Sequence, residues 1–251
     1  MSNNTKRFSN RVDDYVKYRP GYPAAIINYL QDNFALTSNK TIADIGAGTG
    51  ILTALFLDAG YTVWAIEPNK EMREKSVELL KHYPTFISLD ATAENITLPA
   101  NSIDAIIAGQ AFHWFDVEKS KASFKKILKQ DGLLVLIWNE RKTSTPFEIE
   151  YDNLIIKHGK DYVKVNHRNI SDKDIQDFFY PKTCALKVFE NHQVFDFDGL
   201  KGRLLSSSYM PAKDTAGYKE MLLDLVQLFK KHEKNNNIRI DYDTKVYTGK
   251  L

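Results

Sequence analysis

Apolar residues alternate between two kinds of stretch in the first 140 residues. Four short runs rich in β-branched residues are typical of buried strands, at Thr41–Ile45, Thr62–Ile66, Ile103–Ala108 and Leu133–Trp138. Longer stretches with helical spacing of apolar residues separate them. This alternation predicts βαβ units, so we expect an α/β fold with a parallel sheet.

The helical stretches have recognisable ends. The expected helices are Pro23–Phe34, Gly50–Ala59, Lys70–His82 and Glu118–Lys129. Gly60 and Gly132 lie where two of these helices should stop, because glycine readily adopts the left-handed conformation that ends a helix. Each of the two glycines is followed directly by a strand run.

The pattern changes after Asn139. Residues 140–180 are polar and helix-leaning and lack a buried strand run, as expected of an insertion over a sheet edge. We interpret residues 141–184 as a helical cap or lid. Ser171, with Asp174 three residues later, resembles a capping box and predicts the start of a helix.

The last third of the chain returns to strands. Ala185–Phe197 and Ile238–Thr248 have strand patterns, and the segment from about Gly199 to Lys234 has a helical pattern. Two late strands joined by helices would complete the sheet. Residues 1–251 are therefore expected to form a single domain.

Composition and charge exclude several classes of protein. Hydrophobic residues make up 43% and charged residues 26% of the 251 residues, which is ordinary for a globular protein. The 34 basic and 32 acidic residues nearly cancel, so we expect neither nucleic acid nor a membrane surface as a partner. A monomer or a homodimer is expected.

Cellular location and metal binding follow from what the sequence lacks. The polar N-terminus has no signal-peptide core, and no run reaches the ~20 apolar residues of a membrane span, so a cytoplasmic protein is expected. The single cysteine, Cys184, cannot form an internal disulfide. His158, His167 and His192 lack the spacing of metal ligands, so no metal is assigned.

A glycine-rich loop carries the functional argument. The first strand runs directly into DIGAGTG, residues 44–50, and a helix follows. Side chains on these glycines would crowd a bound nucleoside or the tight turn, and free backbone N–H groups at the helix start favour polar ligand atoms. The second strand ends at Glu67, about twenty residues downstream, where a carboxylate can accept both ribose hydroxyls. The pair predicts an adenosine-containing cofactor.

The spacing of the glycines separates two classes of adenosine cofactor. A dinucleotide enzyme normally has G-x-G-x-x-G, whereas this loop reads G-x-G-x-G. Asp44, two residues before the first glycine, would lie awkwardly beside a pyrophosphate but suits a cationic amine. S-adenosylmethionine carries such an amine on its methionine part. An NAD-type oxidoreductase is kept as the alternative enzyme.

These motifs resemble the class I S-adenosylmethionine-dependent methyltransferase family, in particular the small-molecule branch related to trans-aconitate and type 11 methyltransferases. Residues 44–50 resemble its first motif, Glu67 its ribose acid, residues 91–94 the segment that usually meets adenine, and residues 103–115 its fourth strand and following loop. The resemblance implies a Rossmann-like, doubly wound, mostly parallel seven-stranded sheet with an antiparallel last strand.

The two ends of the chain extend the resemblance. Residues from Phe8 to Tyr22 resemble the family's F…Y…R-P-x-Y-P segment, and residues 206–209 and 247–251 resemble its late helix end and last strand. The resemblance implies that residues 1–35 cover the cofactor and bring Tyr15 and Arg19 close to its carboxylate.

The loop and the resemblance together define an expected site. Its cofactor-binding residues are Tyr15, Arg19, Asp44, Gly46, Ala47, Gly48, Gly50, Glu67, Pro68, Thr92, Ala93, Glu94, Gln110 and Ala111. His113, Tyr209 and Arg141 are the expected catalytic residues. His113 follows the fourth strand at the edge where α/β folds bind ligands, with Trp114 as a pocket wall, although the two could form a packed aromatic pair. Tyr209 and Arg141 could also be ordinary surface or hinge residues.

The expected function is methyl transfer to a small molecule by in-line displacement, which needs an acceptor held close to the methyl group in a dry pocket. A carboxylate acceptor could be oriented by Arg141 or Arg19, and a phenol or amine would need a base such as His113. A cofactor-binding protein without turnover is the other alternative. Nucleic-acid methylation is disfavoured, because residues 110–113 read QAFH where such enzymes carry an N/D-P-P-Y/F tetrad.

Overall fold

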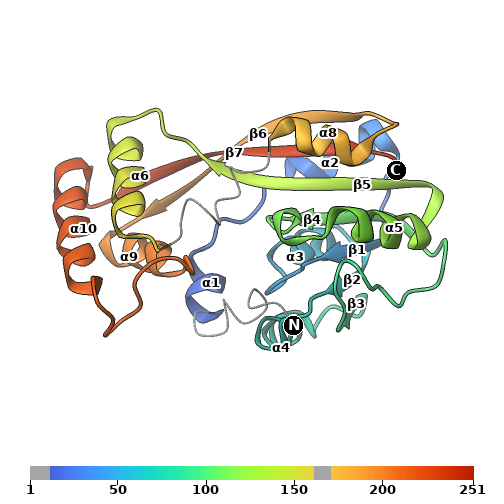
Figure 1. Cartoon of the computed structure of the whole chain (residues 1–251), viewed down its shortest axis with the longest axis horizontal. Coiled ribbons are helices and arrows are strands. Elements are labelled where there is room, and N and C mark those ends of the chain that lie inside the picture. The colour runs from blue at the N-terminus through green and yellow to red at the C-terminus, as the bar shows by residue number, and fades with distance from the viewer. Residues whose placement is uncertain (1–11, 161–170) are drawn as a thin grey trace.

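The computed structural model describes residues 12–160 and 171–251. Phe8, His167 and parts of the expected segments 1–35 and 141–184 lie outside the described residues. Seven strands form one sheet in the order β3-β2-β1-β4-β5-β7-β6, in which β7 runs antiparallel to both β5 and β6 and the other neighbouring pairs are parallel (Figure 1). The strands are β1 (Thr41–Ile45), β2 (Thr62–Ile66), β3 (Phe86–Leu89), β4 (Ile103–Gly109), β5 (Leu128–Arg141), β6 (Cys184–Phe195) and β7 (Ile238–Gly249). The predicted α/β fold class is confirmed.

Helices cover both faces of the sheet. The described α-helices are α1 (Val12–Tyr18), α2 (Ala25–Phe34), α3 (Ile51–Asp58), α4 (Lys70–Leu80), α5 (Val117–Ile127), α6 (Pro146–His158), α8 (Asp172–Phe179), α9 (Phe197–Leu205) and α10 (Tyr218–His232). On one face α2 and α3 pack on Ile42 and Ile107, and on the other α5 and α8 pack on Ala43 and Ile106. Neighbouring residues of a strand point to opposite faces, so both faces of each central strand are buried.

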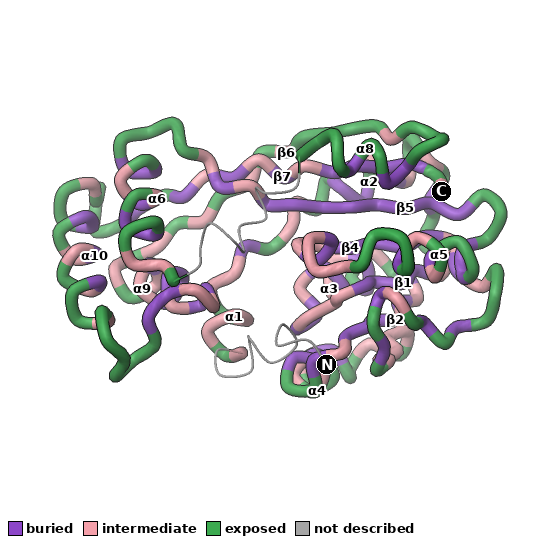
Figure 2. The backbone as a smooth tube through the Cα atoms, in the orientation of Figure 1, coloured by how far each residue is buried: buried purple, intermediate pink, exposed green. Residues whose placement is uncertain are grey.

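A separate hydrophobic cluster lies at one end of the molecule. Here α6, α9 and α10 pack around the first residues of β7, with Tyr151, Leu204, Leu225 and Ile240 fully buried. Figure 1 shows β5 and β7 as long strands that continue from the sheet toward these helices. Figure 2 shows the buried residues gathered along the central strands, whereas β6 at the sheet edge is largely exposed. We call this end of the molecule the helical end.

Most expected boundaries lie within two residues of the observed ones, and the larger differences are at the start of β5 and between α9 and α10. The expected helix over Glu118–Lys129 ends at Ile127, so Gly132 lies inside β5 instead of at a helix end. The residues before Gly132 are polar and exposed, which hid the start of the strand from the hydrophobic pattern. The helical pattern from Gly199 to Lys234 splits into α9 and α10, separated by residues 206–217.

Two short features complete the frame. β3 has only four half-buried residues and therefore no apolar run. Ser171 caps α8: its hydroxyl accepts a hydrogen bond from the Asp174 N–H while the Asp174 carboxylate accepts one from the Ser171 N–H, so the predicted capping box is confirmed. In the described part of the chain, no helix has the length and apolar character needed to cross a membrane.

Candidate functional site

The glycine loop joins the end of β1 to the start of α3. Gly46, Gly48 and Gly50 have φ angles of +68°, +59° and +87°, a region that side chains disfavour. A Cβ atom on Gly46 would lie 2.7 Å from the Cβ of Ala111, and one on Gly50 would lie 2.5 Å from Cδ1 of Leu80. Gly46 therefore lets the loop approach the segment after β4, and Gly50 lets the start of α3 approach α4.

Glu67 stands at the carboxyl end of β2 and is held by the same loop. Its Oε2 accepts a hydrogen bond of 2.8 Å from the Gly48 N–H, and its Oε1 accepts one of 2.7 Å from the Asn69 N–H. Burial raises the pKa of this carboxyl, and the two N–H groups oppose that effect. A carboxylate has further lone pairs beyond these two bonds, so Glu67 can also accept ligand hydroxyls.

The expected cofactor residues lie around two adjoining cavities. The larger cavity, about 220 Å³, lies along the carboxyl ends of β1, β2 and β4 and is lined by Glu67, Thr92 and Ala111 among others. The smaller one, about 40 Å³, is lined by Asp44 and Arg19 among others. Every residue expected to bind cofactor lines one cavity or the other, except Gly50, which packs beneath the loop.

Two buried oxygen atoms in the smaller cavity need hydrogen bonds. Asp44 is fully buried; its Oδ2 accepts a bond of 2.6 Å from the Thr53 hydroxyl, but its Oδ1 has no partner within residues 12–160 and 171–251. Burial raises the pKa of Asp44 to about 7. The Oε1 of Gln110 also lacks a partner in this part of the chain, while its Nε2 donates to the Asn139 carbonyl.

These orphaned acceptors indicate a cationic ligand group. Buried acceptors are nearly always satisfied, and an ammonium group offers donors to both of them. Gln110 itself has a φ of +55°, an uncommon conformation for a residue with a side chain and one that is often found at functional sites. The amine of a methionyl group therefore fits this cavity.

The segment around α1 lies over the cavities and is tied to late parts of the chain. Tyr15 lines both cavities, and the Arg19 guanidinium lies 4.9 Å from the Tyr15 ring centre. Nη2 of Arg19 donates a bond of 3.0 Å to the Ser206 carbonyl. The Tyr18 carbonyl accepts a bond of 3.1 Å from Nε2 of Gln193. Both contacts connect residues at least 175 positions apart.

The three residues expected to be catalytic do not line the larger cavity. His113 lies in a short 3-10 helix, Phe112–Trp114, with its ring 4.6 Å from that of Trp114. Trp114 lines the cavity, as expected of a pocket wall. Arg141, near the end of β5, forms an ion pair with Asp152 of α6. Tyr209 lies in the connection between α9 and α10.

Sequence reasoning missed several residues of the site. Asn69, Met72 and Phe115 line the larger cavity, and Thr53 holds the Asp44 carboxylate. Asn69 carried a signal, because an asparagine directly before a helix is a preferred N-cap, and its side chain accepts a bond from the Met72 N–H. Thr53 and Met72 lie on predicted helices with nothing in the local sequence to mark them, and Phe115 ends the segment 103–115 that resembles the family's fourth strand and following loop.

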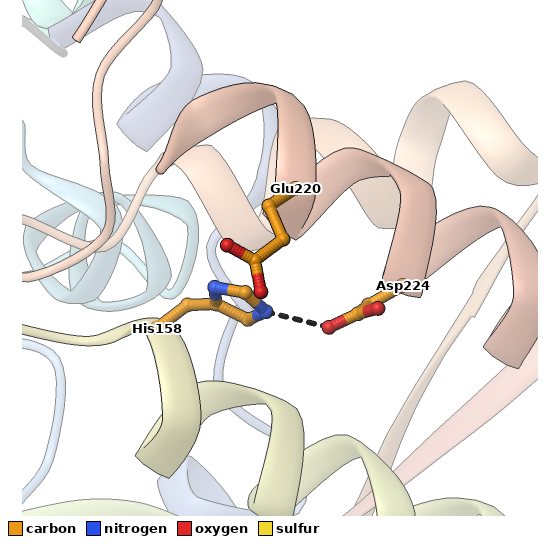
Figure 3. A group of neighbouring side chains, drawn as sticks. All are labelled: His158, Glu220 and Asp224. Atoms are coloured by element: carbon orange, nitrogen blue, oxygen red, sulfur yellow. Dashed lines mark hydrogen bonds and ion pairs between the residues drawn. The ribbon is translucent and has the colours of Figure 1, made fainter. Parts of the chain in front are cut away.

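A cluster of possible metal ligands lies far from the cavities, between α6 and α10. Atoms of His158, Glu220 and Asp224 come within 4.8 Å of one another (Figure 3). Nε2 of His158 lies 2.7 Å from Asp224, and Nζ of Lys157 lies 2.8 Å from Asp224 and 3.3 Å from Glu220. An ammonium group already neutralises both carboxylates, so ion pairs between the two helices explain this cluster.

Part of the chain matches a known family, and several proteins named as methyltransferases are similar to it. Residues 43–136 match the methyltransferase domain family. An uncharacterised methyltransferase of Mycobacterium tuberculosis is 34% identical over 152 residues, which is 61% of this chain and 60% of that protein. A protein of Dictyostelium discoideum named as a methyltransferase is 25% identical over 92% of this chain and 88% of its own length. The chain thus aligns with about 60% of the length of the first of these relatives.

A solved structure agrees with the fold. A protein from Anaeromyxobacter dehalogenans described as a type II methyltransferase superposes with a TM-score of 0.70, covering 93% of this chain and 98% of that one, at 19% identity. The fold of most of the chain is therefore similar to that of this protein.

Proposed function

We propose that the protein transfers the methyl group of S-adenosylmethionine to a small-molecule acceptor, a proposal that the match of residues 43–136 to the methyltransferase domain family supports. The observation that carries the proposal is the pair of buried carboxylates, Asp44 and Glu67, at the ends of neighbouring strands on either side of the glycine loop. Each carboxylate is suited to a different part of this cofactor.

The residues around the cavities divide the cofactor between them. Glu67 would accept the ribose hydroxyls, and the segment of Thr92 to Glu94 would meet the adenine. Asp44 and Gln110 would accept hydrogen bonds from the methionyl amine. Tyr15 and Arg19 would lie at its carboxylate, covered by residues 1–35.

The chemistry requires little from the protein beyond placement. S-adenosylmethionine supplies, when bound, a methyl group already activated on a sulfonium. The chain has to hold the acceptor in line with that methyl group and exclude water. Trp114 and Phe115 provide apolar walls on the larger cavity for that purpose. A carboxylate, a phenol or an amine could serve as the acceptor.

Calorimetry of the purified protein tests the cofactor assignment. S-adenosylmethionine and S-adenosylhomocysteine should bind at micromolar concentration, and NADH should not. Glu67→Ala should lower the affinity for S-adenosylmethionine and for S-adenosylhomocysteine by at least about tenfold, because it removes a charged acceptor of hydrogen bonds. Glu74→Ala is the matched control, since Glu74 lies on α4 with an exposed side chain paired to Lys70. Failure of the folded protein to bind either compound would overturn the proposal.

Turnover distinguishes an enzyme from a cofactor-binding protein. Release of S-adenosylhomocysteine is measured with panels of carboxylates, phenols and amines. Release that requires an acceptor supports the proposed enzyme. Tight cofactor binding with no release for any acceptor class would favour the alternative of a binding protein without turnover.

A further inference from the structure

An asparagine near the end of β5 contacts two sides of the smaller cavity. Asn139 is 3% exposed and lines this cavity. Its main-chain carbonyl accepts a hydrogen bond of 3.1 Å from Nε2 of Gln110, and its Nδ2 donates one of 3.0 Å to the Gly21 carbonyl. In the sequence, Asn139 marked only the point where the hydrophobic pattern changes. The structure therefore adds a residue that sequence reasoning did not select.

The neighbouring strands hold the Asn139 side chain in one orientation. Its Oδ1 accepts a bond of 2.6 Å from the Thr244 hydroxyl on β7 and one of 3.1 Å from Nδ2 of Asn191 on β6. Nδ2 of Asn191 also donates to the Gly21 carbonyl, at 2.9 Å. A carbonyl oxygen can only accept, so the amide nitrogen of Asn139 has to face Gly21 and its oxygen has to face Thr244.

Gly21 belongs to the short segment that closes one side of the smaller cavity. Its neighbours Arg19, Pro20 and Tyr22 all line the cavity. Gly21 itself is exposed, and a Cβ atom on it would meet no atom within 4 Å. Side-chain packing therefore does not hold the segment at this point. The two asparagine amides hold it through the Gly21 carbonyl.

Gln110 lies on the other side of this contact. Because its Nε2 donates to Asn139, the oxygen of the same amide remains as an acceptor, and this Oε1 has no partner in the described ranges 12–160 and 171–251. In the proposed function, Gln110 accepts a hydrogen bond from the methionyl amine and Arg19 lies at the methionyl carboxylate. Asn139 is thus bonded to the residue proposed for one group and to the segment that carries the residue proposed for the other.

We propose that Asn139 is a positioning residue for the amino-acid part of S-adenosylmethionine. Its amide fixes Gly21, and through it Arg19, opposite Gln110, so that both groups are in place before the cofactor binds. Binding then costs less conformational entropy, because the segment does not have to be ordered. The proposal rests on the proposed methyltransferase function. It assigns Asn139 an effect on the amino-acid part and none on adenosine, which Glu67 and the larger cavity would bind.

Two ligands separate these parts of the cofactor. S-adenosylhomocysteine has the amino-acid part, whereas 5′-methylthioadenosine keeps the adenosine and the thioether and lacks it. Asn139→Ala should lower the affinity for S-adenosylhomocysteine at least about fivefold and leave the affinity for 5′-methylthioadenosine within about twofold. Calorimetry measures the first affinity, and competition with S-adenosylhomocysteine measures the second. A residue that only stabilised the fold would change both affinities alike or neither.

Proteolysis gives a second measurement that needs no weak ligand. Lys17 is exposed and lies two residues before Arg19, so the rate of trypsin cleavage after Lys17 reports how firmly the segment is held. In Asn139→Ala this cleavage should be at least about threefold faster than in the wild type. Saturating S-adenosylhomocysteine should slow it in both proteins.

Variants of Thr244 test the same contact from β7. Thr244→Val removes the hydroxyl that donates to Asn139 and nearly keeps the volume, so the affinity for S-adenosylhomocysteine should fall about two- to fivefold. Thr244→Ser keeps a hydroxyl and should bind like the wild type. Asn33→Ala is the matched control and should change nothing, since the Asn33 amide donates to the Tyr29 carbonyl on α2 and lines neither of the two adjoining cavities. If Asn139→Ala does not fold, the two Thr244 variants decide.

The outcomes separate the two proposals. A wild-type protein that binds no S-adenosylhomocysteine would overturn the proposed function itself. Three results in Asn139→Ala would overturn the positioning role and leave the methyltransferase proposal standing: an unchanged affinity for S-adenosylhomocysteine, an equal loss for both ligands, or an unchanged rate of cleavage after Lys17.

Discussion

The cofactor side and the helical end of this protein are built in opposite ways. On the cofactor side, the loop of residues 44–50 and Glu67 come from two consecutive strands, and backbone N–H groups hold the carboxylate. At the helical end, Tyr151, Arg203 and Tyr242 come together from three distant parts of the chain, and Arg19 lies next to them at the boundary with the smaller cavity. A substitution within a local motif acts directly on the site that the motif forms. Where the residues come from distant parts of the chain, their arrangement depends on the packing of the helices and strands that carry them.

Gly48→Arg should have the largest effect and test the cofactor side. The φ of +59° disfavours any side chain, and Gly48 lines both cavities, so an arginine would fill the space needed by the cofactor. S-adenosylmethionine affinity should fall more than about a hundredfold by calorimetry. Gly60→Arg is the matched control, because Gly60 has a φ of +85° on an exposed turn. It should lower the stability of the protein and leave its affinity for S-adenosylmethionine unchanged. If Gly48→Arg keeps the wild-type affinity for S-adenosylmethionine, the glycine loop does not bind the cofactor.

Arg141→Met should affect the stability of the helical end and not the cofactor. It removes the guanidinium that pairs with the Asp152 carboxylate, and breaking a nearly buried ion pair costs about 3–5 kcal/mol. Urea unfolding should show this loss, with S-adenosylmethionine affinity within twofold. In the double variant Arg141→Met with Asp152→Leu, much of the stability should return. A stable Arg141→Met protein that loses turnover would restore the catalytic role expected from the sequence.

Asp44 should make both stability and cofactor binding depend on pH. Its folded pKa of about 7 exceeds the ordinary 3.8, so the folded state holds a proton that the unfolded state releases, and stability falls as pH rises from 4 to 7. Asp44→Asn should therefore gain about 2–3 kcal/mol relative to the wild type between pH 5 and pH 8 in urea unfolding.

Cofactor binding should show the opposite trend. An ammonium group favours the ionised carboxylate, so wild-type affinity for S-adenosylmethionine should rise several-fold from pH 5.5 to 7.5, and Asp44→Asn should be weaker and insensitive to pH. Calorimetry at three pH values measures this. If the affinity of both proteins for S-adenosylmethionine depends on pH in the same way, Asp44 does not bind the amine of the cofactor.

Lys157→Met should have the smallest effect. It removes a cation shared by Glu220 and Asp224 between α6 and α10, and exposed ion pairs contribute about 1 kcal/mol or less. The loss should shrink at high salt, because salt screens exposed charges. Lys230→Met on α10 is the control, since Lys230 has no ion pair in the described residues. Zinc that stabilised the wild type but not His158→Ala would contradict the ion-pair interpretation.

The sequence determined the framework and the cofactor motif of this protein. The expected bounds of β1 and β2 agree with the structure residue for residue, and the loop with Glu67 was recognisable because hydrophobic period, glycine spacing and strand ends are local properties. The cofactor roles of these residues stay predictions until binding is measured.

Only the tertiary structure decided which charges meet. The sequence marked Arg141 as a candidate and did not mark Arg203. It could not show that Asp152 forms an ion pair with Arg141, or that within the described residues the guanidinium of Arg203 donates to the hydroxyls of Tyr242 and Ser207. It also missed that Thr53 leaves one Asp44 oxygen without a partner in the described residues. Contacts between residues far apart along the chain depend on how whole elements pack, and local periodicity carries no information about that packing.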